Sequence, residues 1–237
     1  MNGKCLERKD HEMPVLLIKQ IPLFALLLPH EQETLASMLR RRSIRKGDFL
    51  FHRGDEGTAL YIIFKGLIKI AVSTNRGDEV TLAMLADGDF FGEMALLDDL
   101  PRSTDAMALE DTQLYVLNRA DFLSFLIQNE HAVRAIIQVL SLRLRRTDDM
   151  VAEVCFLNVS ARLAKRLVAL VESRHQVDKG DQQYDVHLTQ RELASLIGVS
   201  RETINKELKI LRQKGIVSTA RRTIAVRDLN RLKNRIR

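Results

Sequence analysis

Hydrophobic and polar positions along this chain follow two different periods, one in each half. From Ser43 to Val116, short runs of β-branched and aromatic residues alternate with turns that contain Gly and Asp, such as Arg53-Gly54-Asp55. Short strands separated by such turns are typical of an antiparallel sandwich or barrel. The runs that we expect to form strands are 49–51, 60–64, 67–72, 80–85 and 113–117, with a hairpin tip at 75–78.

A long helical pattern follows at residues 130–158. One apolar stripe, interrupted by a single threonine, recurs at spacings of four, three, four and three residues: Leu140, Leu144, Thr147, Val151 and Val154. This spacing is that of a coiled-coil seam, and it favours a parallel dimer of two copies of the helix. Packing of the same stripe on the helix's own domain is the alternative.

The segment from Leu188 to Leu211 predicts two short helices joined by a tight turn. Thr189 and Glu192 have the spacing of a capping box at the start of the first helix. Gly198 suits the positive φ that ends a helix, and Ser200 can cap the next one.

The second of these helices has one apolar side and one polar side. Its apolar stripe is Ile204, Leu208 and Leu211, and the outward residues include Arg201, Glu202, Asn205, Lys206 and Lys209. A helix, a glycine turn and a helix with a hydrogen-bonding face form a helix-turn-helix, which reads base edges in the major groove. Two packed helices of an ordinary α-domain are the alternative. Residues 215–219 and 223–226 flank Arg221 and Arg222 as a wing hairpin would.

Charge and composition support binding to nucleic acid. The net charge is +6, but residues from Thr189 onward hold thirteen Lys or Arg and four acidic residues, which gives +9 there and −3 in the rest. A basic segment of this kind neutralises phosphates. Two cysteines allow no disulfide framework and no four-cysteine metal site, which fits a reducing cytoplasm. The apolar run 15–29 contains Lys19, Gln20 and Pro22, so we expect no membrane span.

Residues 91–104 contain the groups that an anion-binding site needs. Gly92 and Glu93 lead into a short apolar helical turn that starts with Met94 and Ala95, and Arg102 and Ser103 follow a proline. Amide groups at a helix start together with a guanidinium bind anions. A surface loop with an Arg–Glu pair is the alternative.

Three motifs in this order resemble one family. GDFLFHRGDEGTALYIIFKGLIKI, then GDFFGEMALLDDLPRSTDAMA, then SRET at the second helix are similar to the CRP/FNR family of bacterial transcription regulators. The resemblance implies an α+β fold with an N-terminal extension (1–20), an antiparallel β-roll of the cyclic-nucleotide-binding type (21–129), a dimerisation helix (130–158) and a winged helix-turn-helix (159–237). It implies a cytoplasmic homodimer that binds palindromic DNA and RNA polymerase and is not an enzyme.

The same resemblance implies a cyclic-nucleotide effector, with cAMP first, cGMP second and a cyclic dinucleotide third. The two cysteines cannot supply four iron–sulfur ligands and the six histidines show no ligand-like spacing, so we expect no metal or haem. Glu93 would bind the ribose 2′-hydroxyl and Arg102 the cyclic phosphate. Gly92, Met94, Ala95 and Ser103 would complete the phosphate cradle, and Thr147 would touch the base.

Two aspartates depart from the family pattern. Asp148, where serine is usual, can accept a hydrogen bond from an adenine amino group or from guanine, so the base stays open. Asp105 would repel a phosphate if it faced the pocket. A regulator that responds to no cyclic mononucleotide is therefore the alternative. A further alternative is a cyclic-nucleotide-binding module that regulates another protein.

For DNA, the resemblance implies half-sites related to TGTGA. Lys206 stands where an arginine is usual, and lysine lacks the rigid fork that bridges guanine O6 and N7, so we expect relaxed preference there. The residues expected to contact DNA are Thr189, Gln190, Ser200, Arg201, Glu202, Thr203, Asn205, Lys206, Lys209, Arg221 and Arg222.

Overall fold

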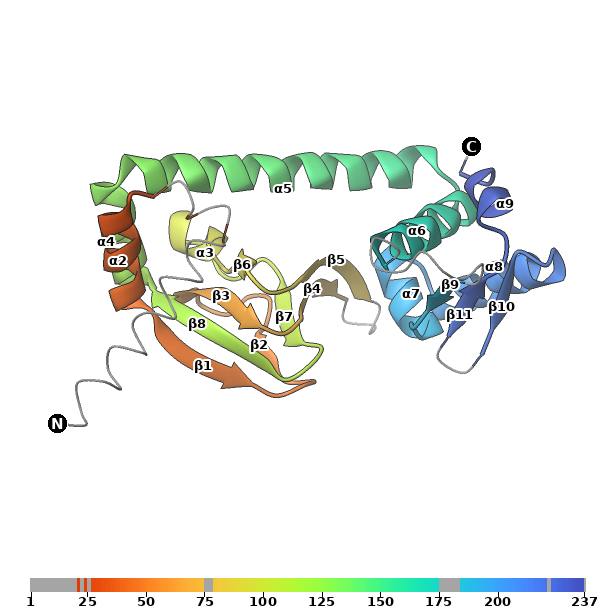
Figure 1. Cartoon of the computed structure of the whole chain (residues 1–237), viewed down its shortest axis with the longest axis horizontal. Helices are drawn as coiled ribbons and strands as arrows, with labels where there is room; N and C mark the ends of the chain where they lie inside the picture. Colours follow the sequence, from red (N-terminus) through yellow and green to blue (C-terminus); the bar gives the residue numbers. More distant parts are fainter. Residues whose placement is uncertain are drawn as a thin grey trace. The chain divides into compact units, whose positions relative to one another are not determined.

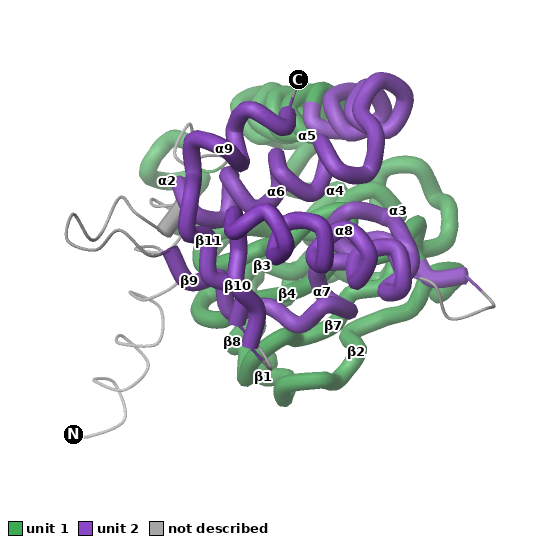
Figure 2. The backbone as a smooth tube through the Cα atoms, turned by 90° about the vertical axis from the view of Figure 1, so that its right-hand side faces the viewer, with its two compact units in different colours: residues 1–72, 82–145 green, residues 73–81, 146–237 purple. Residues whose placement is uncertain are grey.

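The computed structural model describes residues 21, 24, 27–74, 79–174, 184–220 and 223–236. The chain divides into two compact units, residues 1–72 with 82–145 and residues 73–81 with 146–237 (Figure 2). The extension 1–20, the hairpin tip expected at 75–78 and the two wing arginines, Arg221 and Arg222, lie outside the described residues.

Two four-stranded sheets dominate the first half of the chain (Figure 1). One has the strand order β1-β8-β3-β6 and the other the order β2-β7-β4-β5. The strands are β1 (Arg40–Ile44), β2 (Phe49–Phe51), β3 (Ala59–Lys65), β4 (Ile68–Ser73), β5 (Glu79–Leu85), β6 (Phe90–Phe91), β7 (Asp105–Ala108) and β8 (Thr112–Asn118).

Strand β3 shows why the sheets pack as they do. Tyr61 and Ile63 belong to the core between the two sheets, whereas Leu60 and Ile62 belong to a second core on the other side. Because both faces of the strand are buried, its sequence is a continuous apolar run rather than an alternation.

Helices form the outer wall of the second core. They are α2 (Pro29–Met38), α3 (Met94–Leu97), α4 (Arg119–Gln128) and the first turns of α5 (Glu130–Phe156). Helix α5 ends at Phe156, two residues before the end of the predicted segment. Asn158 starts a new helix instead, because its Oδ1 accepts a 2.9 Å hydrogen bond from the amide of Ala161.

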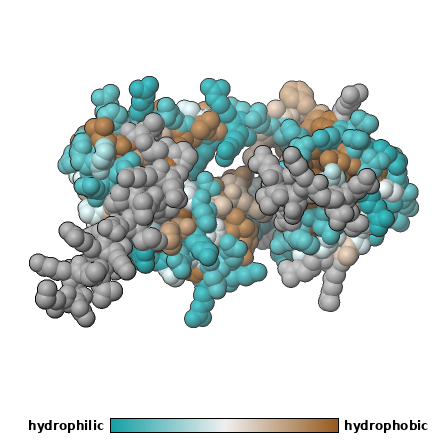
Figure 3. All heavy atoms as spheres, viewed as in Figure 1, coloured by the Kyte–Doolittle hydropathy of each residue, from teal (hydrophilic) through white to brown (hydrophobic). Residues whose placement is uncertain are grey.

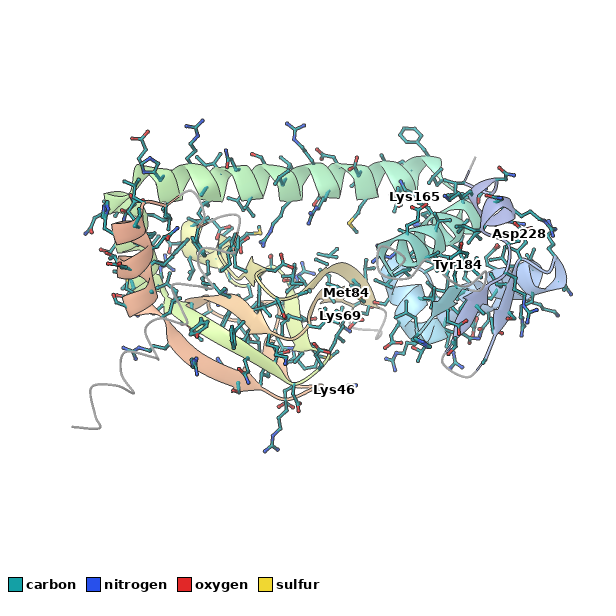
Figure 4. All side chains as sticks on the ribbon, in the orientation of Figure 1. Lys46, Lys69, Met84, Lys165, Tyr184 and Asp228 are labelled. Atoms are coloured by element: carbon teal, nitrogen blue, oxygen red, sulfur yellow. The ribbon has the colours of Figure 1, made fainter. Side chains whose placement is uncertain are left out.

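The described residues of the second half form a three-stranded antiparallel sheet, order β10-β11-β9, and four helices around a separate core. Figure 4 labels Tyr184 on β9 and Asp228, whose Oδ1 accepts a 2.8 Å hydrogen bond from the Arg231 amide and caps α9. The elements are α6 (Val159–Arg174), β9 (Tyr184–Val186), α7 (Gln190–Ile197), α8 (Arg201–Gln213), β10 (Val217–Thr219), β11 (Ile224–Val226) and α9 (Leu229–Lys233).

The α+β fold class is confirmed, and the five strands expected from the pattern are present within one or two residues. Strands β1, β6, β7 and β9 were not expected. Strand β1 escapes a pattern search because it reads Arg-Arg-Arg-Ser-Ile, with four exposed residues and one buried residue. It lies at the end of its sheet and pairs with β8 alone among the described strands.

Candidate ligand site and nucleic-acid interface

The anion-site residues come together around the side chain of Arg102. Its Nη1 donates to the carbonyl oxygen of Gly92 at 2.6 Å, and its Nη2 donates to that of Ala59 at 2.7 Å. The next residue, Ser103, places its hydroxyl 4.0 Å from the sulfur of Met94 in the first turn of α3. The segment 101–103 thus lies against the segment that leads into α3, as an anion site at this place requires.

Arg102 is a buried cation held between aromatic rings. Arg102 is 4% exposed, and its guanidinium carbon lies 4.3 Å from the ring centre of Phe51 and 5.7 Å from that of Tyr61. Burial lowers the pKa of Arg102, while Tyr61 and the carboxylates of Glu93 and Asp55 raise it. An arginine stays protonated under such opposed shifts, so the site keeps a positive charge.

Gly92 makes this arrangement possible. Its φ is +87°, and a Cβ there would lie 2.7 Å from Nη1 of Arg102. Any larger residue would therefore strain the backbone and push the guanidinium away from the carbonyl that it binds.

Glu93 is the second buried charge of the site. It is 1% exposed, and its Oε1 forms an ion pair with Arg143 of α5. Arg143 also donates to the carbonyl oxygen of Phe90 and lies 4.8 Å from the centre of that ring. The other oxygen, Oε2, is buried and has no hydrogen-bond partner among the described residues, so it can accept from a donor such as a hydroxyl.

Our sequence reasoning missed Arg143. The signal that identifies it is its spacing, because it precedes Thr147 by one helical turn on α5.

The predicted helix-turn-helix is present in full local detail. Thr189 Oγ1 accepts from the amide of Glu192 at 3.2 Å, and the carboxylate of Glu192 accepts from the amide of Thr189 at 2.6 Å. Gly198 has φ +71°, and Ser200 Oγ accepts from the amide of Thr203 at 3.2 Å. Both caps and the turn glycine are therefore confirmed.

Helix α8 buries Ile204, Leu208 and Leu211 and leaves its polar side outward. The residues of that side are exposed or partly exposed: Arg201, Glu202, Thr203, Asn205, Lys206 and Lys209. Strands β10 and β11 pair in the register Val217–Val226 and form the arms of the expected wing. Arg212 Nη1 donates to Thr219 Oγ1 at 3.2 Å, which fixes the end of α8 to this wing.

Comparison with known proteins agrees with both halves. The family models described as "Cyclic nucleotide-binding domain" and "Crp-like helix-turn-helix domain" match residues 41–129 and 161–235. The "Cyclic AMP receptor protein" of Thermus thermophilus is 35% identical over 211 residues, which cover 89% of this chain and 94% of that protein. The chain belongs to the CRP/FNR family of transcription regulators.

Another relative and a solved structure are also similar to this CRP/FNR-family chain. The "CRP-like cAMP-activated global transcriptional regulator" of Mycobacterium tuberculosis is 29% identical over 93% of this chain and 99% of that protein. Among solved structures, the c-di-GMP responsive regulator CLP of Xanthomonas campestris matches with a TM-score of 0.75 at 24% identity, over 83% of this chain and 98% of that one. The latter likeness shows the fold.

The apolar stripe of α5 in this CRP/FNR-family chain is exposed except at Leu140, which is partly buried and packs against the core of the first half. Leu144, Val151 and Val154 are 63%, 57% and 61% exposed, and Val133 and Ile137 continue the same spacing toward the start of the helix. Figure 3 shows hydrophobic residues reaching the surface along α5. Thr147 and Asp148 are also exposed on this helix.

No described helix is long and apolar enough to cross a membrane. Within the same residues, no three His, Cys, Asp or Glu side chains gather where they could hold a metal ion.

Proposed function

We propose that the protein is a dimeric DNA-binding regulator whose β-roll binds a cyclic mononucleotide, cAMP first and cGMP second. One observation supports the binding of a cyclic nucleotide. The buried Oε2 of Glu93 has no partner among the described residues, and the neighbouring Gly92 is hydrogen-bonded to the buried cation Arg102. A ribose hydroxyl would donate to Oε2, and a cyclic phosphate would take the guanidinium of Arg102, the hydroxyl of Ser103 and the first amides of α3.

Both charged groups have partners within the protein, although Oε2 of Glu93 has none among the described residues. Arg102 donates to two backbone carbonyls, and Glu93 pairs with Arg143. A phosphate must therefore win a share of the Arg102 guanidinium from Gly92 and Ala59. The exchange is favourable because a bond from arginine to an anionic oxygen is stronger than one to a neutral carbonyl.

The base would be read from α5. Thr147 lies one turn beyond Arg143, and the adjacent Asp148 can accept from the amino group of adenine or from the N1–H and amino groups of guanine. We rank cAMP first because the relatives named above carry cAMP in their names.

The DNA-binding half supports the second part of the proposal. Two copies joined along Leu140, Leu144, Thr147, Val151 and Val154 would present two α8 helices to a palindrome with half-sites about one helical turn apart. Arg201 and Glu202 would read base edges, and the wing arginines Arg221 and Arg222 would meet phosphates. RNA polymerase is the further partner that we expect.

Ligand would act by shifting the equilibrium between two arrangements of the dimer. It can change DNA affinity only through its different affinity for the two arrangements, which typically amounts to about 1–3 kcal/mol of coupling. A regulator that responds to another signal would show no such coupling with a cyclic mononucleotide.

Isothermal titration calorimetry with cAMP, cGMP and cyclic di-GMP tests the ligand, since the chain has no tryptophan to report binding. We expect micromolar binding of a mononucleotide. Because Arg102 is buried, Arg102→Lys is the milder variant and should weaken binding by more than tenfold. Ser103→Ala removes a second proposed phosphate contact at an exposed site, so weaker binding by this variant would not come from loss of folding. Binding of cyclic di-GMP alone, or of none of the three nucleotides, would contradict the proposal and favour a regulator that responds to no cyclic mononucleotide.

A further inference from the structure

The turn after β2 is bonded to the backbone of the ligand-site arginine. The amide of Gly54 donates to the carbonyl oxygen of Arg102 at 2.9 Å, and the amide of Arg102 donates to the carbonyl oxygen of Asp55 at 2.8 Å. These two bonds form a reciprocal pair between segments some fifty residues apart in the chain. The position of the Arg102 backbone therefore depends on the position of this turn.

The same turn also touches the other arm of the site. A Cβ on Gly57 would lie 2.3 Å from the Cβ of Ala95 in α3, so Gly57 packs against α3 with no room for a side chain. Any movement of residues 52–57 would thus displace both Arg102 and the first turn of α3.

Asp105 holds this turn in place. It is the first residue of β7, three residues after Arg102, and its side chain is 12% exposed. Its Oδ1 accepts from the amide of Arg53 at 2.8 Å and lies 3.5 Å from Nδ1 of His52. The carboxylate is therefore bonded to the backbone of the turn.

This placement bears on the charge of Asp105, which would repel a phosphate if it faced the pocket. A carboxylate that accepts from a backbone amide is partly neutralised by that dipole, and such charge-assisted bonds are among the strong ones. The observed bond gives the aspartate a structural reason to be where the family pattern has a different residue.

We propose that Asp105 is a positioning residue of the ligand site, which fixes the turn 52–57 and through it the backbone of Arg102. The inference rests on the proposed binding of a cyclic nucleotide. Asp105 itself does not touch the ligand: it acts through Arg53 and Gly54.

Two substitutions at Asp105 separate positioning from repulsion. Asp105→Asn keeps an oxygen that accepts from the Arg53 amide, whereas Asp105→Ala removes it. With cAMP as the calorimetric probe, positioning predicts that Asp105→Ala weakens binding about tenfold and that Asp105→Asn stays within about threefold of the parent. Repulsion predicts that both variants bind more tightly, and that result would overturn the proposal.

Asp111→Ala is the matched control. Asp111 also accepts from a turn amide, that of Lys46 at 2.9 Å, but in the turn between β1 and β2. This variant should leave cAMP affinity within about twofold of the parent, because Asp111 does not bond to the turn 52–57. It shares with Asp105→Ala only the general loss of stability from one missing turn bond. Equal weakening by Asp111→Ala and Asp105→Ala would refute a positioning role.

Hydrogen exchange of the ligand-free protein keeps this inference separate from the proposed function. Asp105→Ala should speed exchange of the amides of Arg53, Gly54 and Arg102, and Asp111→Ala should not. If the parent bound no cyclic nucleotide, the proposed function would fail while faster exchange still upheld the link from Asp105 to Arg102. Unchanged exchange at these three amides would overturn the inference whatever the nucleotide result.

Discussion

Arg143 of α5 forms an ion pair with Glu93, the buried carboxylate that precedes α3. The side chain of Glu93 is 2% exposed and that of Arg143 is 32% exposed. The long helix is therefore joined to the proposed ligand site by an ion pair at the boundary between the protein interior and solvent. A ligand that bonds to Glu93 necessarily changes the surroundings of Arg143.

Replacing Arg143 by methionine should leave Glu93 buried without its cation. Removing one partner of a fully buried pair costs about 3–5 kcal/mol, and since Arg143 is partly exposed we expect about 2 kcal/mol less stability in urea unfolding. Arg145→Met, at an exposed arginine two residues along the same helix, is the control and should cost under about 0.5 kcal/mol. Equal losses in the two variants would argue against a stabilising pair.

Leu144 and Leu142 offer a test of the proposed dimer on one helix. Both are exposed, at 63% and 57%, but two residues correspond to about 200° of rotation, so Leu142 lies on the opposite side from the stripe. Leu144→Glu should give a monomer in light scattering at micromolar concentration, because it puts two carboxylates into the seam. Leu142→Glu should remain a dimer, and dissociation of both variants to the same extent would exclude this stripe as the interface.

Gly198 joins the two helices of the helix-turn-helix with φ +71°. A Cβ there would lie 3.6 Å from Val80 Cγ2, an ordinary contact, so the cost of Gly198→Ala comes from the backbone alone. We expect a loss of about 1–2 kcal/mol in chemical denaturation. Gly198→Asn should lose less, because asparagine tolerates the left-handed region, and a larger loss for asparagine would contradict this reasoning.

Lys206 faces outward from the first turns of α8, where we expect it to read a base. Lys206→Arg should sharpen the preference for guanine at one position of each half-site by about tenfold, because the arginine fork bonds both O6 and N7. Binding-site selection followed by anisotropy titration measures this ratio. Lys214→Arg, just past the end of α8, should leave the selected sequence unchanged. A Lys206→Arg variant with the parent's preferences would remove Lys206 from base reading.

Elements with a strong local signal were predicted well. The helix-turn-helix follows from caps and a glycine that act within four residues, and the structure confirms Thr189, Gly198 and Ser200 in those roles. Strand β3 follows from its apolar run, because both of its faces are buried.

Features that depend on distant parts of the chain were not predictable in the same way. Strand β1 begins with three arginines and is a strand because β8 pairs with it, some seventy residues later. The ion pair of Arg143 with Glu93 and the bond of Asp105 to the Arg53 amide both join segments about fifty residues apart. Local periodicity contains no information on such contacts. Arg102 and Glu93 were therefore predicted as site residues, but the groups that bond to them were not.

Strand β1 has one further consequence, for how copies of this protein meet. The edge strand of a sheet presents unpaired backbone groups on which a strand of another molecule can grow, and this is a common route to aggregation. Arg40, Arg41 and Arg42 are exposed along this edge, and no strand of their sheet contains an acidic residue. Two such edges brought together would set like charges opposite one another. Such edges therefore repel one another, which leaves the uncharged stripe of α5 as the surface on which the proposed dimer would form.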